Sequence, residues 1–321
     1  MPDKTSMEKF EYVPCDICGS ENWENAGSMQ DKSYGVPGRF SIVRCKLCGL
    51  LYTNPRPKAK QLSDLYNPYY GEENPQNEDL SKPEPFIKRH KKLRSLYHWV
   101  CGQYLTEILS KAKGRVLDVG CGNGDLLSEL IEMECDCFGL EPNPKAVQTC
   151  VRKGLKIEQG TLDQFDLPIN FFDTVILWHV IEHLPSPKKA LKSIYKILKD
   201  KGSLFVYCPN ADSYMSRFFN ENWRGWHLPF HFYHFTPDTF NRLLTTTGFK
   251  TYSIKTVTPD FIFSESLKNC FKDRGCVQKW IIKNGLFNSF TFRVVSGFFF
   301  RFLDVSLRMQ GECLRVELRK D

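Results

Sequence analysis

Four cysteines near the amino terminus have the spacing of a metal site. Cys15 and Cys18 form one C-x-x-C unit, Cys45 and Cys48 form a second, and a glycine follows each unit. Two intervening residues let one tight turn present both sulfur atoms to the same ion, and a glycine accepts the positive φ that such a turn requires. Because two units supply four thiolates, the pattern predicts a structural zinc ion in a small ribbon over residues 1–57. A redox-active pair of cysteines is the alternative interpretation.

A glycine-rich segment, D-V-G-C-G-N-G-D from Asp118 to Asp125, has the composition of a nucleoside-binding turn. Its glycines allow a sharp turn from strand to helix and a close approach of a ligand to the backbone. A dinucleotide-binding loop needs glycine or alanine where Asp125 stands, and an acidic residue there disfavours a pyrophosphate. Asp118 suits a positively charged ligand instead, and Glu141, at the end of the next predicted strand, can accept hydrogen bonds from two ribose hydroxyls. The combination favours an adenosine-containing ligand with an amino group and a sulfonium, while an ordinary tight turn and a nicotinamide dehydrogenase are the alternatives.

Five of the seven histidines fall in two short segments. His179 and His183 flank Glu182 in the first, and His231 lies in the second. Because imidazole exchanges a proton near neutral pH, His231, His179 and His183 are candidate catalytic bases, with His231 preferred. The structural interpretations are that His183 braces its loop, that His179 lines a cofactor pocket and that His227 packs among tryptophans.

Alternating strand and helix patterns surround these segments. The predicted strands cover 115–119, 135–140, 155–158, 172–178 and 203–207, and the predicted helices cover 125–133, 144–152 and 187–198. Such alternation predicts an α/β fold with a doubly wound parallel sheet and helices on both faces. Ligands bind such sheets at the carboxyl ends of the strands, which is where every candidate residue outside the cysteine units lies.

The flanking segments differ from this pattern. Residues 58–85 form a polar, proline-rich linker, in which Tyr69 and Tyr70 could contact an acceptor, and helical spacing follows over 86–112. We expect a phenylalanine-rich helical insert over 260–310, where one helix face is an apolar stripe and the other is charged. The stripe consists of Phe287, Phe290, Val294, Phe298, Phe302 and Val305. The charged face consists of Arg293, Arg301, Asp304 and Arg308. Packing of the stripe on the sheet or on a second subunit is one interpretation, and a lid or interfacial helix for a lipid-linked acceptor is the other.

The overall composition is that of a folded protein. The 321 residues are 41% hydrophobic, no apolar run has the length of a membrane span, and the amino terminus lacks the apolar stretch of a secretory signal. Thirteen cysteines without such a signal favour a reducing compartment, so we expect a cytoplasmic protein, peripheral at a membrane if the insert contacts lipid. The net charge is +7, and residues 250–321, with 13 basic and 7 acidic side chains, contribute most of it. This distribution does not favour a nucleic acid as partner.

The segment from Val116 to Asp125, with Glu141-Pro142 and H-V-I-E-H from His179 to His183, resembles class I S-adenosylmethionine-dependent methyltransferases. The resemblance covers about 86–257, with 312–320 as the last strand. It implies a Rossmann-like sheet of seven strands in the order 3-2-1-4-5-7-6, the seventh antiparallel. The cysteine units followed by N-P-R-P at 54–57 resemble the subgroup that includes sugar C-methyltransferases. The predicted organisation is a zinc ribbon over 1–57, a linker over 58–85 and a methyltransferase domain over 86–321.

The resemblance also implies roles for individual residues. Asp118, Gly120 and Gly122 would hold the methionine portion of S-adenosylmethionine, Glu141 would bind its ribose, and Thr161-Leu162 would border its adenine. The complete predicted cofactor-binding set is Asp118, Gly120, Cys121, Gly122, Gly124, Glu141, Pro142, Thr161, Leu162 and Trp178.

The acceptor is less well defined by sequence. Sugar C-methyltransferases have a Tyr-x-Glu-His pattern where this chain has Leu228-Pro-Phe-His231, and only the histidine matches. This difference moves the expectation from carbanion chemistry on a keto-sugar toward O-methylation. We therefore predict methyl transfer to a hydroxyl or carbon of a small, glycosyl or lipid-linked acceptor. The alternatives are a non-catalytic module that binds zinc and S-adenosylmethionine, and a nucleic-acid methyltransferase, against which stands the absence of an Asn-Pro-Pro-aromatic tetrad after the fourth strand.

Overall fold

The computed structural model describes residues 9–58, 61, 96–97, 99–100, 105–272, 290–306 and 310–321. Its centre is one seven-stranded sheet in the order β12-β13-β10-β9-β6-β7-β8, in which β13 is antiparallel to both its neighbours. This is the predicted strand order, read from the opposite edge. The strands are β6 (Arg115–Val119), β7 (Asp136–Glu141), β8 (Ile157–Gln159), β9 (Phe172–Trp178), β10 (Leu198–Pro209), β12 (Lys250–Val257) and β13 (Cys313–Arg319).

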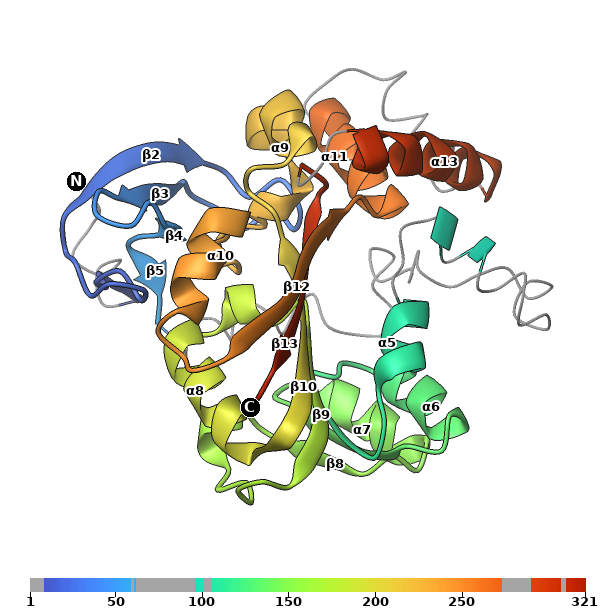
Figure 1. The fold of residues 1–321 in the computed structure, drawn as a ribbon. Coiled ribbons are helices and arrows are strands. Elements are labelled where there is room, and N and C mark those ends of the chain that lie inside the picture. Colours follow the sequence, from blue (N-terminus) through green and yellow to red (C-terminus); the bar gives the residue numbers. More distant parts are fainter. Residues whose placement is uncertain are drawn as a thin grey trace.

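Helices cover both faces of this sheet (Figure 1). One face carries α5 (Leu105–Lys111), α6 (Asp125–Glu132) and α7 (Pro144–Arg152), and the other carries α8 (Pro187–Ile197) and α10 (Pro237–Leu244). The last three of these helices begin with proline after a polar N-cap residue, whose side chain accepts hydrogen bonds from the first-turn amides. Local sequence therefore fixes where these helices start, and the predicted doubly wound α/β fold is confirmed.

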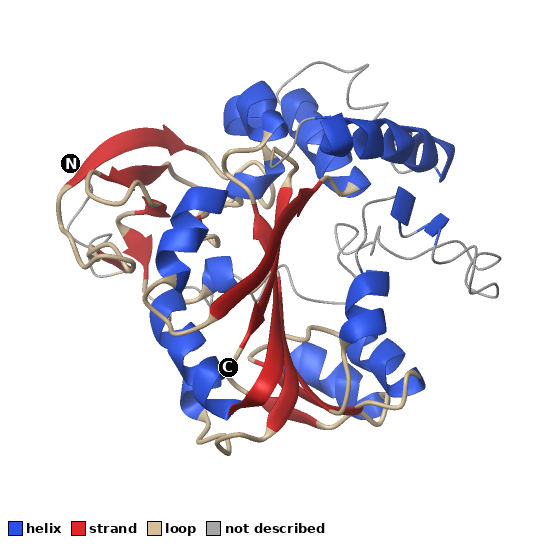
Figure 2. Cartoon of the chain, viewed as in Figure 1, coloured by secondary structure: helices blue, strands red, loops and turns tan. Residues whose placement is uncertain are grey.

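A second, smaller sheet lies beside the first at the amino-terminal end (Figure 2). Its order is β11-β4-β3-β2, all antiparallel, and a short pair of β1 and β5 accompanies it. The strands are β1 (Phe10–Glu11), β2 (Trp23–Met29), β3 (Phe40–Cys45), β4 (Leu51–Thr53), β5 (Arg56–Pro57) and β11 (Tyr233–His234). Since β11 comes from the predicted methyltransferase domain, the residues on the two sides of the predicted boundary at 57 share one sheet.

The hydrophobic core is continuous across that boundary as well. Cys15 and Tyr52 of the amino-terminal region belong to the same buried cluster as Leu177 of β9 and Phe235 after β11. The ribbon is therefore packed into the body of the protein.

Three helices lie beyond the carboxyl end of β10 and form a cap at the top of Figure 1. They are α9 (Tyr214–Phe219), α11 (Asp260–Lys272) and α13 (Phe290–Ser306). The described residues also form short 3-10 helices between other elements, namely η2 (Leu162–Gln164), η3 (Ile181–His183), η4 (Asn220–Asn222) and η5 (Arg224–Trp226). The described parts of the predicted insert 260–310 are thus helical. None of the helices in the described ranges is long and apolar enough to cross a membrane.

The orientation of α13 differs from that expected if its apolar stripe packed on the sheet, while packing on a second subunit stays a prediction. Phe298 and Phe302 are 52% and 68% exposed, whereas Arg293 and Arg301 are each 6% exposed. Arg301 can be buried because it pairs with Asp304 at 2.7 Å and donates to the carbonyl of Thr258. The expectation that the apolar stripe packs on the sheet was therefore wrong for these residues, since the charged face points inward.

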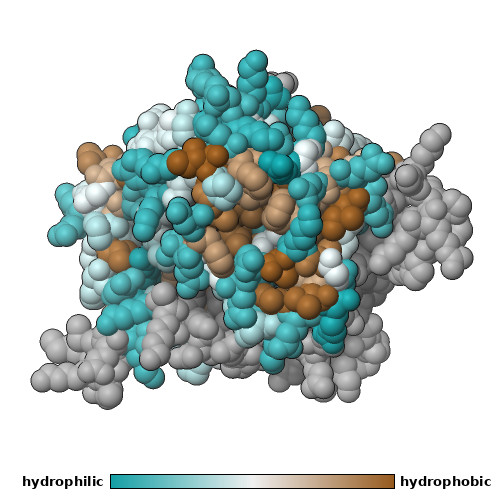
Figure 3. All heavy atoms as spheres, turned by 90° about the horizontal axis from the view of Figure 1, so that it is seen from below, coloured by the Kyte–Doolittle hydropathy of each residue, from teal (hydrophilic) through white to brown (hydrophobic). Residues whose placement is uncertain are grey.

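Some expectations fall on other parts of the chain. The linker 58–85 except residues 58 and 61, most of the helix predicted over 86–112, and the side chains of Tyr69, Tyr70, Phe287 and Arg308 lie outside the described residues. Figure 3 shows the face opposite the cap, where hydrophobic side chains are interleaved with hydrophilic ones. That face differs from α13, whose described exposed residues include a run of large apolar side chains: Val295, Phe298, Phe299, Phe302 and Val305.

Candidate active site

The glycine loop between β6 and α6 makes the sharp turn, with positive φ values, that its sequence predicts. Gly120, Gly122 and Gly124 have φ values of 71°, 54° and 73°, a region that favours glycine. A Cβ atom on Gly120 would lie 2.6 Å from Val180, and one on Gly124 would lie 2.3 Å from a Leu155 methyl group. A Cβ atom on Gly122 would meet nothing within 4 Å. Two glycines are therefore required by packing, and Gly122 borders open space.

Two buried carboxylates lie beside this loop at the ends of neighbouring strands. Asp118 in β6 is 2% exposed, and its Oδ1 has no hydrogen-bond partner in the described part of the chain. Burial, and then the charge of Glu141, raise the pKa of Asp118 to about 8. Glu141 at the end of β7 accepts hydrogen bonds from the amides of Gly122 at 2.9 Å and Asn143 at 2.8 Å. A cationic ligand bound over Gly122 would give the Asp118 carboxylate a positively charged partner. These residues therefore fit S-adenosylmethionine.

The other predicted cofactor residues lie along the same edge of the sheet. The amide of Gly160 donates to the carbonyl of Glu141 at 3.0 Å, which places Thr161 and the buried Leu162 next to β7. Trp178 ends β9 and stacks on Tyr207 with ring centroids 4.5 Å apart. Cys121 lies within the loop, and Pro142 follows Glu141 on the surface. The structure thus brings the predicted set together at the carboxyl ends of β6 to β9.

Four histidines and one buried glutamate form a cluster beyond β9. Glu182 is fully buried, and its Oε1 lies 3.3 Å from His179 Nδ1 and 3.9 Å from His231 Nε2. The rings of His183 and His231 are 4.6 Å apart, and His227 Nδ1 lies 3.3 Å from His231 Nε2. The two histidine segments, which lie about 50 residues apart in the sequence, therefore form one group.

Burial differs strongly within this group. The side chain of His179 is 29% exposed, and that of His231 is 8% exposed. Burial lowers the pKa of His183, and it lowers the pKa of His231 well below its usual range, with further lowering from His183 and His227. His179 has a left-handed backbone with φ of 53°, a conformation uncommon for non-glycine residues and often found at functional sites.

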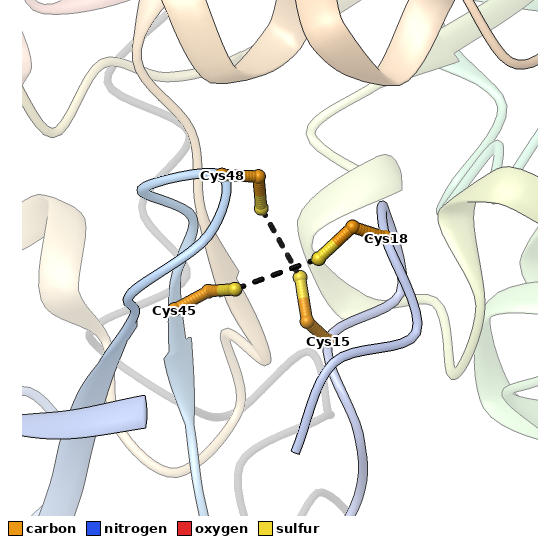
Figure 4. Close-up of side chains that lie close together, drawn as sticks. All are labelled: Cys15, Cys18, Cys45 and Cys48. Atoms are coloured by element: carbon orange, nitrogen blue, oxygen red, sulfur yellow. Dashed lines mark hydrogen bonds between the residues drawn. The ribbon is translucent and has the colours of Figure 1, made fainter. Parts of the chain in front are cut away.

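The four amino-terminal cysteines converge on one point (Figure 4). The sulfur atoms of Cys15 and Cys48 are 3.3 Å apart, those of Cys18 and Cys45 are 3.5 Å apart, and all four lie within 4.8 Å of one another. A tetrahedral ion with Zn–S distances of about 2.3 Å requires sulfur separations of about 3.8 Å. The cluster therefore fits a tetrahedral metal ion.

The cysteine turn is attached to the rest of the protein by residues that sequence reasoning did not identify. The carboxylate of Asp16 accepts hydrogen bonds from the amide of Lys188 at 2.8 Å and the hydroxyl of Ser186, at the start of α8. An anion at a helix amino terminus is stabilised by the free amides and the helix dipole. Asp16 lies inside a C-x-x-C unit, and only the N-cap pattern at Ser186 offered a local hint of an anion-binding helix start.

Two more residues that sequence reasoning did not identify, Thr53 and Arg56, connect the ribbon to the segments that carry the histidines. The Thr53 hydroxyl donates to the carbonyl of His231 at 2.8 Å, and the Thr53 amide donates to the carbonyl of Phe232 at 2.8 Å. Arg56 donates to the carbonyl of Pro185 at 2.8 Å and contacts the hydroxyl of Tyr233 at 3.2 Å. The ribbon thus supports the backbone that presents His231. Nothing in the local sequence signals these contacts, because they join positions more than 120 residues apart.

Comparison with known proteins agrees with this geometry. The family described as "Methyltransferase domain" matches residues 91–254, slightly more than half of the chain. A ubiquinone biosynthesis O-methyltransferase of Xanthomonas euvesicatoria is 28% identical over 111 residues, which cover 32% of this chain and 46% of that protein. An uncharacterized methyltransferase of Anoxybacillus flavithermus is 32% identical over 111 residues, covering 33% of this chain and 52% of that protein. This chain spans about half the length of the curated relatives it matches.

Solved structures of methyltransferases match a larger share of this chain, at low sequence identity. A SAM-dependent methyltransferase from Archaeoglobus fulgidus is 18% identical with a TM-score of 0.47, over 74% of this chain and all of that one. The family match covers the glycine loop, Glu141 and the H-V-I-E-H segment, and these residues have the geometry described above. The chain therefore belongs to the methyltransferase-domain family, of the class I S-adenosylmethionine-dependent type.

Proposed function

We propose that this protein transfers the methyl group of S-adenosylmethionine to a hydroxyl oxygen of a small, glycosyl or lipid-linked acceptor. The observation that carries the proposal is the unpaired, buried Asp118 carboxylate beside the open side of Gly122, with Glu141 at the next strand end. When bound, S-adenosylmethionine supplies a methyl group on a positively charged sulfur. Asp118 would then pair with the cationic end of the cofactor, and each Glu141 oxygen retains a lone pair for a ribose hydroxyl.

We propose His179 as the base that takes the proton of the acceptor hydroxyl. Of the three sequence candidates, His179 has a partly exposed side chain and a carboxylate, Glu182, 3.3 Å from its Nδ1. A carboxylate at Nδ1 orients the ring and leaves Nε2 for the proton, as in other histidine bases. His231 was preferred from sequence, but its buried side chain donates from Nδ1 to the carbonyl of Gly225 at 2.8 Å. We therefore propose that His231 supports the site from behind.

The proposed methyl transfer needs only the acceptor hydroxyl, His179 and S-adenosylmethionine for its atoms and electrons to balance. His179 Nε2 would take the proton of the hydroxyl as its oxygen accepts the methyl group that bound S-adenosylmethionine supplies, and S-adenosylhomocysteine would be the leaving group, with the electron pair of the broken carbon–sulfur bond on its sulfur. Most of the rate enhancement should come from alignment of oxygen, methyl and sulfur in a dry site. Support for oxygen as the acceptor atom comes from the missing tyrosine and glutamate before His231 and from relatives that are named O-methyltransferases.

We further propose that the four-cysteine cluster holds a structural zinc ion. The sulfur separations fit a closed tetrahedral site, and four thiolates leave no position for a substrate. Through Asp16 at α8 and Thr53 at the His231 segment, the ion would also hold part of the active site in place.

The exposed stripe of α13 supports a lipid-linked acceptor as one acceptor class. Aromatic side chains on the exposed face of a helix can insert into the headgroup region of a membrane. Arg293 and Arg301 of α13 are buried, so attraction to anionic lipids would come from the net positive charge of residues 250–321 as a whole. We propose that the exposed apolar residues of α13 make such a peripheral contact: Phe298, Phe302 and Val305 of the predicted stripe, with Val295 and Phe299 beside them.

Calorimetry followed by methyl-transfer assays tests the proposed function. The full chain should bind S-adenosylmethionine and S-adenosylhomocysteine, and transfer of labelled methyl should be found with phenolic, glycosyl or lipid acceptors. Binding without transfer to any acceptor pool would favour the non-catalytic module, and transfer only to nucleic acid would reject the proposed acceptor class. Absence of cofactor binding would reject the proposal altogether.

A further inference from the structure

Glu182, His183 and His231 form a second group of potential metal ligands, separate from the cysteines. One ligand atom from each of the three lies within 4.8 Å of the other two. Glu182 and His183 belong to η3, and His231 comes from the segment before β11. The amide of Phe232 donates to the carbonyl of Glu182 at 2.8 Å, which fixes the two segments against each other.

Both histidines are oriented in the way that metal ligands usually are. His183 Nδ1 lies 2.9 Å from the carbonyl oxygen of Phe230, and His231 Nδ1 lies 2.8 Å from that of Gly225. A carbonyl oxygen only accepts hydrogen bonds, so the proton must be on Nδ1, and Nε2 of the neutral ring carries a lone pair. A ligating histidine typically donates its other ring N–H to a carbonyl or carboxylate, which fixes the tautomer and the ring orientation.

The glutamate gives a second, independent observation. Glu182 is fully buried, and its Oε2 has no hydrogen-bond partner among the residues that the structure describes. Its ion-pair contacts in the same residues are with His179 and His231, at 3.3 Å and 3.9 Å. A buried carboxylate is costly unless it is paired or binds a metal ion. Glu182 thus has the burial of a metal ligand and an oxygen in need of a partner.

We propose that Glu182, His183 and His231 bind a divalent transition-metal ion such as Zn²⁺, Fe²⁺ or Mn²⁺. Two imidazoles and one carboxylate are a common ligand set for these ions, whereas Mg²⁺ and Ca²⁺ prefer oxygen ligands alone. Ligand separations around such an ion are about 3.0–3.4 Å for bonds of about 2.1 Å, so small side-chain rotations close the 3.9 Å gap between His231 and Glu182. His231 Nε2 lies 3.3 Å from His227 Nδ1, whose N–H can donate to it, and a metal ion bound at Nε2 would take the place of that donor.

Three protein ligands leave coordination positions open. Because Glu182 also orients His179, the ion would lie next to the proposed base, where it could bind and polarise an oxygen of the acceptor. That consequence rests on the proposed function, but the metal site does not, since none of its ligands belongs to the predicted cofactor-binding set.

Metal content of the full chain tests the proposal. After equilibration with excess Zn²⁺ and removal of free ion, elemental analysis should find two equivalents per chain, one for the cysteines and one for this site. Glu182→Gln and His231→Gln should each retain one equivalent, with second-site affinity lower by at least tenfold. His179→Gln is the matched control, because it also contacts Glu182 but is not among the three ligands, and it should retain two equivalents.

A spectroscopic measurement covers the case in which a buried variant fails to fold. Co²⁺ added to the wild-type chain whose cysteine site already holds Zn²⁺ should give ligand-field bands without the thiolate charge-transfer bands of a cysteine site. A single equivalent of Zn²⁺ in the wild type, thiolate bands as the sole Co²⁺ signal, or two equivalents in a folded Glu182→Gln variant would overturn the proposal. Calorimetry with S-adenosylmethionine on the same samples separates this outcome from failure of the proposed function.

Discussion

Replacing Asp118 with asparagine should change stability and cofactor affinity in opposite directions. The pKa of this carboxyl is raised from 3.8 to about 8 by burial and by the charge of Glu141. A group with a higher pKa in the folded state binds more protons when folded, so its contribution to stability is lost as the pH rises from about 4 to about 8. The asparagine side chain does not ionise, so the stability of the variant does not decrease in this way as the pH rises.

The expected size follows from the same shift. With an unfolded-state pKa of 3.8, the cost of Asp118 is on the order of 3 kcal/mol at pH 6 and 5 kcal/mol at pH 8. The free energy of unfolding of Asp118→Asn, minus that of the wild type, should therefore grow by about 2 kcal/mol over this range. The new side-chain amide also lacks a hydrogen-bond partner, which lowers the free energy of unfolding of the variant by about 1–3 kcal/mol. This penalty is the same at every pH, so it does not change how the stability difference varies with pH.

Urea denaturation of the cofactor-free proteins at pH 6, 7 and 8 measures this difference. Asp125→Asn is the matched control, because it makes the same chemical change at an exposed position of the same loop and should leave the pH dependence unaltered. Affinity for S-adenosylmethionine should fall at least tenfold in Asp118→Asn, since a hydrogen bond to a charged group contributes about 1.5–3 kcal/mol. A stability difference that stays constant from pH 6 to pH 8, or wild-type affinity in the variant, would refute the reasoning.

Four other perturbations test the remaining parts of the site. Gly122→Arg should abolish cofactor binding in calorimetry while the circular dichroism spectrum is kept, because a side chain there enters the open side of the loop at a positive φ; retained binding would place the cofactor elsewhere. His179→Ala should lower turnover by about 10²–10⁴ with unchanged cofactor affinity, and the same signature in His231→Ala alone would exchange the two roles. Cys48→Ser should lose one zinc equivalent and lower turnover more than cofactor affinity, because Thr53 supports the His231 segment and touches no cofactor residue; equal turnover with and without the ion would argue against that support. The pair Phe298→Asp and Phe302→Asp should abolish flotation with anionic liposomes at low salt, whereas the same change at Ile169, exposed outside α13, should not.

Local sequence was sufficient wherever one segment determines its own structure. Helix α7 begins and ends where predicted, because the Asn143 side chain caps its first amides and Pro144 fits the first turn. Strand β9 also matches its predicted bounds, because a run of buried apolar residues at the centre of a parallel sheet is continuous in the sequence. The glycine loop, the two C-x-x-C turns and the carboxylate at the end of β7 follow from the same kind of local pattern.

The tertiary structure decided which segments meet and which face of an element points inward. Helical periodicity shows that α13 has an apolar and a charged face. The charged face points inward, where Arg301 pairs with Asp304 and donates to the carbonyl of Thr258. Strand β11 completes the sheet of the ribbon, and Thr53 and Arg56 thereby reach the histidine segment. The choice between His179 and His231 as base likewise depended on burial, which no spacing encodes. Periodicity and turn residues act over a few positions. The contacts of Arg301 with Thr258, and of Thr53 and Arg56 with the histidine segment, join positions 43 to 178 residues apart, and folding of the whole chain selects them.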